Sequence, residues 1–215
     1  MKKLLLSLLC LGICFGMAGC SSSDESGNQE IQKEYFSADK VTHKIYKGKE
    51  EQIIVQIDNN NDCPVYVEPL LDLYLKDKKI DSLNGDANED LNIQPKSTRY
   101  IYFWVYDVKY DDMKVVYNTC EEEYTSNLCD DKDVEIKDEN LSTDVQITMK
   151  NKSENHIEVN GEVVYFKNKK PIYVSPIMGS YAIGQELDPG ESYKTKCSKP
   201  DEKYDNYKVY TYCWY

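Results

Sequence analysis

The side chains best suited to chemistry in this chain of 215 residues are eight cysteines and two histidines. His43 and His156 stand far apart, and neither belongs to a His-x-x-x-His pair. The sequence also has no Cys-x-x-Cys pair and no glycine-rich phosphate loop. Nucleophilic catalysis and metal binding both need such groups in clusters. We therefore expect no catalytic residue, no metal site and no cofactor, and we interpret both histidines as exposed polar loop residues.

One acidic stretch could bind a cation. Asp58–Asp62 has oxygen-bearing side chains at alternate positions, as a calcium-binding EF-hand loop does at its start. That loop needs glycine at its sixth position and glutamate at its twelfth, where this chain has Cys63 and Pro69. We interpret the stretch as a polar hairpin turn.

The N-terminal segment predicts export and lipid attachment. Lys2 and Lys3 precede an apolar run over 4–15, which is shorter than the roughly 20 residues that span a bilayer and is typical of a signal peptide. The following Met17-Ala18-Gly19-Cys20 resembles the lipobox of bacterial lipoproteins. The resemblance implies cleavage before Cys20 and a diacylglycerol on its sulfur. The alternatives are cleavage near Cys14, where the bulky Ile13 fits less well, and an ordinary signal peptide that leaves Cys20 unmodified.

The residues after Cys20 predict a tether and exclude one class of partner. Residues 21–30 offer no apolar side chain to bury, which is typical of a flexible linker. Without residues 1–19, 24 basic residues face 38 acidic ones, so the net charge moves from -12 to -14. Arg99 is the only arginine. Such a chain repels phosphate backbones, so we expect no nucleic-acid binding and a membrane contact made through the lipid alone.

The rest of the chain carries an internal echo. Four short motifs recur in the same order with offsets of 92, 91, 94 and 94 residues. They are VQIDNNN (55–61) with ITMKNKS (147–153), LYLKDKK (73–79) with VYFKNKK (164–170), IQPKS (93–97) with LDPGE (187–191), and YDDMKV (110–115) with YDNYKV (204–209). Four ordered echoes indicate a duplication, and we expect a signal peptide over 1–19, a lipidated cysteine and tether over 20–34, and repeats over 35–127 and 128–215.

Each predicted repeat has the pattern of short strands. Val, Ile and Tyr alternate with polar residues, and turn residues separate the runs. We therefore predict an all-β fold of two tandem antiparallel immunoglobulin-like β-sandwich domains. The motifs quoted above resemble the FxLYD-type repeats of bacterial surface lipoproteins, which implies the same fold and a surface location, and implies no catalytic residues.

The exported cysteines predict disulfides. Cys197 and Cys213 are equidistant from Asp205, so a hairpin centred there would place them on opposite strands, and we predict that they are bonded. Cys120 and Cys129 form a second predicted pair, which leaves Cys63 free or paired between molecules.

A run of aromatic residues predicts a binding strip. Tyr100, Tyr102, Trp104 and Tyr106 share one face of a predicted strand, while Ile101, Phe103 and Val105 share the other. The aliphatic face fits a core better, which leaves the tyrosine face either exposed to a ligand or covered by the neighbouring repeat. We expect a non-catalytic adaptor for an envelope protein, peptide or cell-wall glycan, and the alternative is a structural spacer of an envelope complex.

Overall fold

Alternating apolar residues give this protein strands throughout, so the all-β prediction is confirmed. The computed structural model describes residues 36–85, 91–120, 129, 131–177 and 186–215, and the predicted signal peptide, Cys20 and tether lie outside these ranges. None of the described helical turns is longer than three residues, and no described helix is long and apolar enough to cross a membrane.

We call strands β1–β7 the N-terminal half and strands β8–β13 the C-terminal half. The elements of the N-terminal half are η1 (Ala38–Lys40), β1 (Val41–Lys47), β2 (Gln52–Asn59), β3 (Val65–Leu75), β4 (Lys78–Asn84), β5 (Leu91–Ile93), β6 (Thr98–Trp104) and β7 (Asp112–Cys120). Those of the C-terminal half are η3 (Asp131–Asp133), β8 (Val134–Asn140), β9 (Asp144–Asn151), β10 (Glu158–Lys167), β11 (Lys170–Ile177), β12 (Ser192–Ser198) and β13 (Asn206–Trp214).

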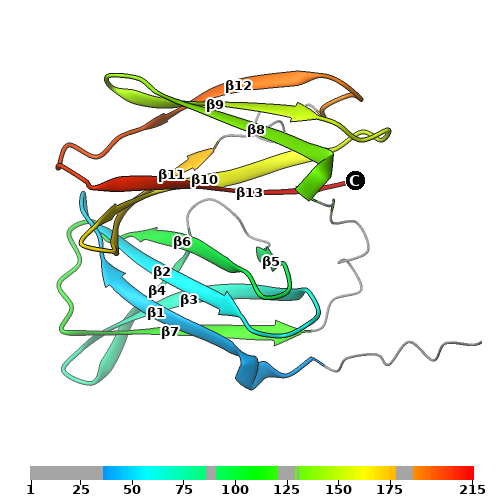
Figure 1. Cartoon of the computed structure of the whole chain (residues 1–215). Coiled ribbons are helices and arrows are strands. Elements are labelled where there is room, and N and C mark those ends of the chain that lie inside the picture. Colours follow the sequence, from blue (N-terminus) through cyan, green and yellow to red (C-terminus); the bar gives the residue numbers. More distant parts are fainter. Residues whose placement is uncertain (1–35, 86–90, 121–128, 130, 178–185) are drawn as a thin grey trace, which may run out of the picture. The chain divides into compact units, whose positions relative to one another are not determined.

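Both halves have the same strand order (Figure 1). The N-terminal half has one sheet ordered β1-β2-β6 and a second in which β3 lies between β4 and β7, with β5 paired to one end of β3. The C-terminal half has the sheets β8-β9-β12 and β11-β10-β13. All pairings are antiparallel.

Each half buries its own apolar cluster between its two sheets. The cluster of the N-terminal half includes Ile101, Phe103 and Val105, so these three residues face the core as predicted. The cluster of the C-terminal half includes Val145, Ile147 and Tyr165. The alternation of strand residues therefore supplies two separate cores.

Two-residue turns fix the register of equivalent hairpins. Lys76 and Asp77 join β3 to β4 with φ of 51° and 61°, and Asn168 and Lys169 join β10 to β11 with φ of 51° and 64°. Positive φ at both central residues is the geometry that matches strand twist in a short hairpin. These turns match at an offset of 92, one more than the sequence echo of 91, so the structural counterpart of Leu73 is Tyr165.

A buried asparagine ties two loops together in each half. The side-chain amide of Asn59 donates to the carbonyls of Cys63 at 2.9 Å and Ile93 at 3.0 Å. The amide of Asn151 donates to the carbonyls of Asn155 at 2.7 Å and Leu187 at 2.8 Å. These asparagines begin the polar turns of the first sequence echo, so the echo marks a shared hydrogen-bonding role.

Candidate binding surface

The predicted aromatic strip is divided between a buried part and an exposed part. Tyr100 and Tyr102 are 8% and 6% exposed, Trp104 is half-buried and Tyr106 is 57% exposed. The rings of Trp104 and Tyr106 stack with their centroids 5.5 Å apart and their planes 9° apart. Within the strip, Trp104 at the end of β6 and Tyr106 just beyond it therefore offer aromatic surface to solvent.

The buried part of the strip contacts the C-terminal half. Tyr100 and Tyr102 belong to a third apolar cluster that joins residues of both halves. Its buried members are Ile54, Tyr100, Tyr102, Val164, Phe166 and Val174. We call this cluster, together with the polar contacts below, the interface between the halves. It is formed by the outer face of β2 and β6 and the outer face of β10 and β11.

Paired hydrogen bonds fix the position of this interface. The Gln52 side-chain amide donates to the Val174 carbonyl at 2.9 Å, and its oxygen accepts the Val174 N–H at 2.9 Å. The Lys49 N–H donates to the Ile172 carbonyl at 2.7 Å. Gln52 is 1% exposed, and burying an amide without such partners would cost roughly 2 kcal/mol or more.

A buried ion pair adds charge recognition to the interface. Arg99 Nε lies 3.2 Å from Glu162 Oε1, and the guanidinium carbon lies 3.4 Å from the centroid of the Tyr212 ring. Burial raises the pKa of Glu162, and the Arg99 charge opposes the rise. Burial alone would lower the pKa of Arg99, but the Glu162 charge offsets this and the pKa is raised. The only arginine of the chain is thus used between the halves.

The C-terminal half buries the outer face of β10 and β11 in the interface. The equivalent outer face of the N-terminal half is exposed to solvent. Leu70 lies three residues before the bulge of β3, as Glu162 lies three residues before the bulge of β10. Leu70 pairs with Val116 on β7, as Glu162 pairs with Tyr210 on β13. Leu70 and Val116 are 37% and 47% exposed.

Charged side chains that have partners of their own lie beside Leu70 and Val116. Lys79 Nζ lies 2.7 Å from Asp72 Oδ1, and Lys114 Nζ lies 4.9 Å from the centroid of the Tyr74 ring. We call this outer face of β4, β3 and β7 the open face. An apolar centre with a polar rim is typical of protein interfaces. Sequence reasoning missed it, although the outward positions of the two halves, compared at the structural offset, contain the signal.

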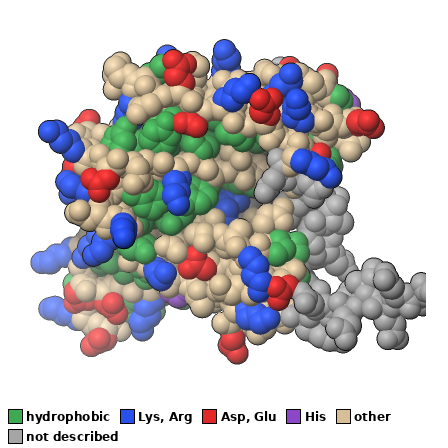
Figure 2. All heavy atoms as spheres, viewed as in Figure 1, with side chains coloured by type: hydrophobic (Ala, Val, Ile, Leu, Met, Phe, Trp, Pro, Cys, Tyr) green, Lys and Arg blue, Asp and Glu red, His purple; other side chains and the backbone are tan. Residues whose placement is uncertain are grey.

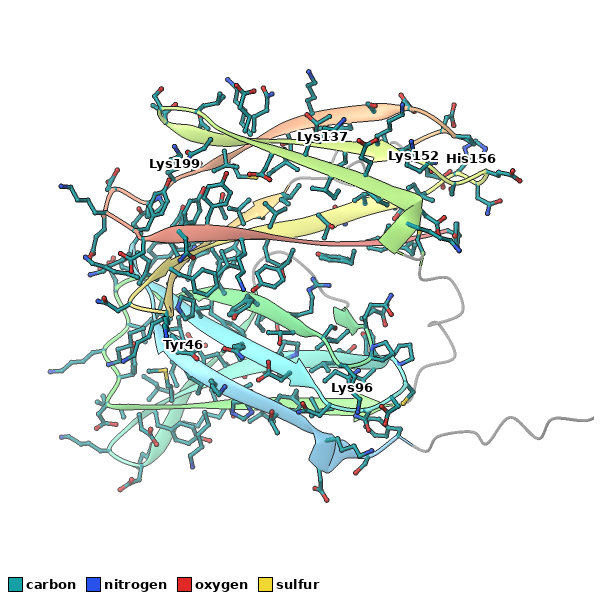
Figure 3. All side chains as sticks on the ribbon, in the orientation of Figure 1. Tyr46, Lys96, Lys137, Lys152, His156 and Lys199 are labelled. Atoms are coloured by element: carbon teal, nitrogen blue, oxygen red, sulfur yellow. The ribbon has the colours of Figure 1, made fainter. Side chains whose placement is uncertain are left out.

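The C-terminal half has a charged outer face where the N-terminal half has an aromatic one. The outer face of β8, β9 and β12 is the counterpart of the face that carries Tyr100 and Tyr102. It has lysines instead, and we call it the lysine face. Its lysines are Lys137, Lys150, Lys194 and Lys196. Figure 3 labels Lys137 on β8, and its Nζ lies 2.7 Å from Glu135 Oε1. In the view of Figure 2, positive and negative side chains alternate around hydrophobic areas instead of gathering by sign.

The two histidines do not meet in one site. His43 lies on β1, not in a loop as expected, with Nδ1 3.1 Å from the Tyr117 hydroxyl. His156 is an exposed loop residue, as expected, with Nδ1 2.7 Å from Asp188 Oδ1. No group of three potential metal ligands occurs among the described residues. The expected absence of catalytic and metal residues stays a prediction.

The predicted Cys197–Cys213 hairpin is absent, which corrects the sequence interpretation. Cys197 lies on β12, which pairs with β9, whereas Cys213 lies on β13, which pairs with β10 in the other sheet. The Cys197 thiol instead donates to the Pro176 carbonyl at 3.6 Å, and burial, followed by the nearby Asp144 charge, raises its pKa to about 12. The chain after β12 crosses between sheets, so distance from Asp205 does not set a register.

The second predicted pair involves Cys120 and Cys129. The Cys120 side chain lies outside the described part of the structure, as do residues 121–128. Cys129 is 4% exposed and lies beside Cys213.

Comparison with known proteins assigns no family. No family model matches the chain, and no curated protein matches it. Among solved structures it is similar to a crystal structure of the YadV chaperone, with 11% identity and a TM-score of 0.26 over 81% of this chain and 92% of that chain. This similarity is too loose to support a function.

Proposed function

We propose that this chain is a lipoprotein attached through Cys20 to the extracytoplasmic face of a bacterial cell membrane. In this proposal two tandem immunoglobulin-like sandwiches, the N-terminal and C-terminal halves, act as a non-catalytic adaptor for another envelope protein. The lipobox and the tether support the location. The equal strand order of the halves and their matched asparagines support the tandem repeats.

The observation that carries the adaptor function is the open face. The equivalent face of the C-terminal half is covered by a sheet of the N-terminal half. Leu70 and Val116 are equivalent to Glu162 and Tyr210. Glu162 bonds to Arg99 of the N-terminal half, and Tyr210 packs against the cluster between the halves. A face with the same place in the same fold suits the same kind of occupant. The occupant is the flat sheet face of a partner protein, with aliphatic and tyrosine side chains like those of Ile54 and Tyr100.

This reasoning favours a protein over a glycan or a second copy. Sugars bind exposed aromatic platforms, and the burial of Tyr100 and Tyr102 leaves only the Trp104–Tyr106 pair of the strip for such contact. A second copy docking in the same head-to-tail manner would present its lysine face, and burying lysine ammonium groups against Leu70 is unfavourable.

The test is photo-crosslinking of the full-length chain in the membrane of cells that produce it. Benzoylphenylalanine replaces Leu70 or Val116, and the control carries it in place of Thr148, on the lysine face. We expect both open-face positions to give an adduct with one and the same protein and the control to give none. Adducts with a second copy, or no adduct at either position, would overturn the adaptor proposal.

A second variant separates binding from folding. Leu70→Asp adds a charge to an exposed side chain, so Tm should change by less than about 2 °C. The same variant should lose the adduct formed at position 116. An adduct that survives Leu70→Asp would contradict binding through this face.

The structural spacer has its own support. Tyr100 and Tyr102 are buried in the interface between the halves, where they help to hold the halves in a fixed arrangement. A spacer needs such rigidity and no ligand. Absence of adducts at Leu70 and Val116, together with correct membrane attachment, would favour the spacer.

A further inference from the structure

The buried thiols of Cys129 and Cys213 lie side by side in the core of the C-terminal half. The N–H of Cys129 donates to the carbonyl of Cys213 at 3.0 Å. The two thiols also share a hydrogen bond, so their sulfur atoms face each other, as a disulfide requires. The two side chains are 4% and 6% exposed and belong to the same apolar cluster.

A second contact keeps these two segments together. The Tyr215 hydroxyl donates to Asp133 Oδ2 at 2.8 Å, two residues beyond Cys213 and four beyond Cys129. The last strand, β13, is therefore tied at its end to the segment that leads into β8. The proximity of the two cysteines does not depend on a single hydrogen bond.

We propose that Cys129 and Cys213 form a disulfide that fastens the start of the C-terminal half to its last strand. This inference rests on the proposed extracytoplasmic location, because exported thiols meet oxidants. It replaces both sequence-predicted pairs and leaves Cys197 as a buried thiol. The oxidant is the disulfide of an exported thiol oxidoreductase.

The reaction is two successive thiol–disulfide exchanges. The thiolate of one cysteine attacks the oxidant disulfide, which releases one oxidant thiolate and forms a mixed disulfide. The second cysteine, as its thiolate, then attacks its partner's sulfur and releases the other oxidant thiolate. The two thiols lose two electrons and two protons in total, and the oxidant leaves as a dithiol.

Burial determines when the bond can form. A hydrogen bond with Cys129, followed by burial, raises the pKa of the Cys213 thiol. The thiolate is the nucleophile, so the folded dithiol reacts slowly with oxidants and alkylating agents. Oxidation therefore precedes final packing of β13, and the finished bond is protected from reductants.

Peptide mapping of the full-length chain tests the connectivity. The chain is extracted from membranes with its free thiols alkylated under denaturing conditions, and it is digested without reduction. We expect a peptide with Cys129 linked to one with Cys213, and Cys197 alkylated. A Cys197–Cys213 or Cys120–Cys129 link would overturn the assignment.

Refolding in vitro separates this inference from the proposed location. The purified, reduced chain is refolded with oxidised glutathione and mapped in the same way. If the membrane-derived chain is reduced but the refolded chain contains the Cys129–Cys213 link, the location is wrong and the pairing stands. If the refolded chain lacks this link, the pairing is wrong.

Variants provide a readout through stability. Reduction of the wild-type chain under denaturing conditions, followed by refolding, should lower Tm by roughly 10 °C, because the bond closes a long loop. Cys129→Ala should abolish this dependence on reductant, whereas the matched control Cys197→Ala should keep it. Equal dependence in both variants would contradict the proposal.

Discussion

Removing the carboxylate of Glu162 should lower the free energy of unfolding more than removing any surface charge does. Glu162→Gln leaves the Arg99 guanidinium buried without its counter-ion. Loss of one partner of a buried pair costs about 3–5 kcal/mol. Arg99 keeps its 3.3 Å hydrogen bond to the Asn92 carbonyl and its contact with the Tyr212 ring, so we expect the lower end, about 3 kcal/mol. For a chain of this size, that lowers Tm by roughly 6–12 °C.

The assay is thermal unfolding followed by circular dichroism, with two comparisons. Lys137→Gln breaks an ion pair of 2.7 Å in which the Lys137 side chain is 72% exposed, and it should shift Tm by less than about 2 °C. The double variant Arg99→Met/Glu162→Leu removes both charges and should recover most of the loss. A Glu162→Gln shift no larger than that of Lys137→Gln would refute the reasoning, as would a double variant as unstable as the sum of its single changes.

The Arg99→Met variant adds a pH signature. Without the guanidinium, the pKa of the buried Glu162 rises further above its ordinary value. A carboxyl with a raised folded-state pKa favours folding at low pH and loses that contribution as pH rises through the folded value. The destabilisation should therefore be larger at pH 8 than at pH 5. Equal losses at both values would show that Glu162 is not buried.

Three further outcomes are expected from the structure. Asn151→Ala removes two side-chain hydrogen bonds to loop carbonyls and should lower the free energy of unfolding by about 2 kcal/mol, measured from urea midpoints. Gly161→Ala places a Cβ 2.1 Å from a carbonyl oxygen of β13 and should cost about 3 kcal/mol or prevent folding, whereas Gly85→Ala, with no contact closer than 3.7 Å, should retain the wild-type Tm. Hydrogen bonds from Lys79 and Ser82 lower the pKa of Asp72, so its contribution is present at neutral pH and is lost as pH falls through the folded value; Asp72→Asn should reduce the difference between urea midpoints at pH 7 and pH 3.

Local patterns in the sequence predict the strands and the turns well, because period-two alternation and turn residues act over a few neighbours. The aliphatic side of β6 is found from alternation alone, and the polar turns at Asn59 and Asn151 coincide with buried amides that bind loops. The alignment of LYLKDKK with VYFKNKK is shifted by one residue relative to the structure. The residue types match best at an offset of 91, whereas equivalent strand positions match at 92. One residue inverts the side to which every strand residue points.

Sheet membership is what the sequence does not reveal. Cys197 and Cys213 have suitable spacing for a hairpin, but β12 and β13 join different sheets. Whether Tyr100 and Tyr102 are buried likewise depends on which outer face contacts the other half. A tyrosine-rich strand face is equally suited to an interface within the chain and to a ligand. The open face is invisible until Leu70 and Glu162 are recognised as equivalent positions.

The interface between the halves joins two different faces, and this has a consequence for assembly between molecules. A contact between unlike surfaces can repeat from one molecule to the next and build an open filament. Repeat proteins stop such growth with a polar outer surface on a terminal unit. The lysine face, with Lys194 and Lys196 where the N-terminal half has Tyr100 and Tyr102, ends the series after two units. Lys194→Tyr/Lys196→Tyr would remove this stop and should cause the chain to assemble into fibres.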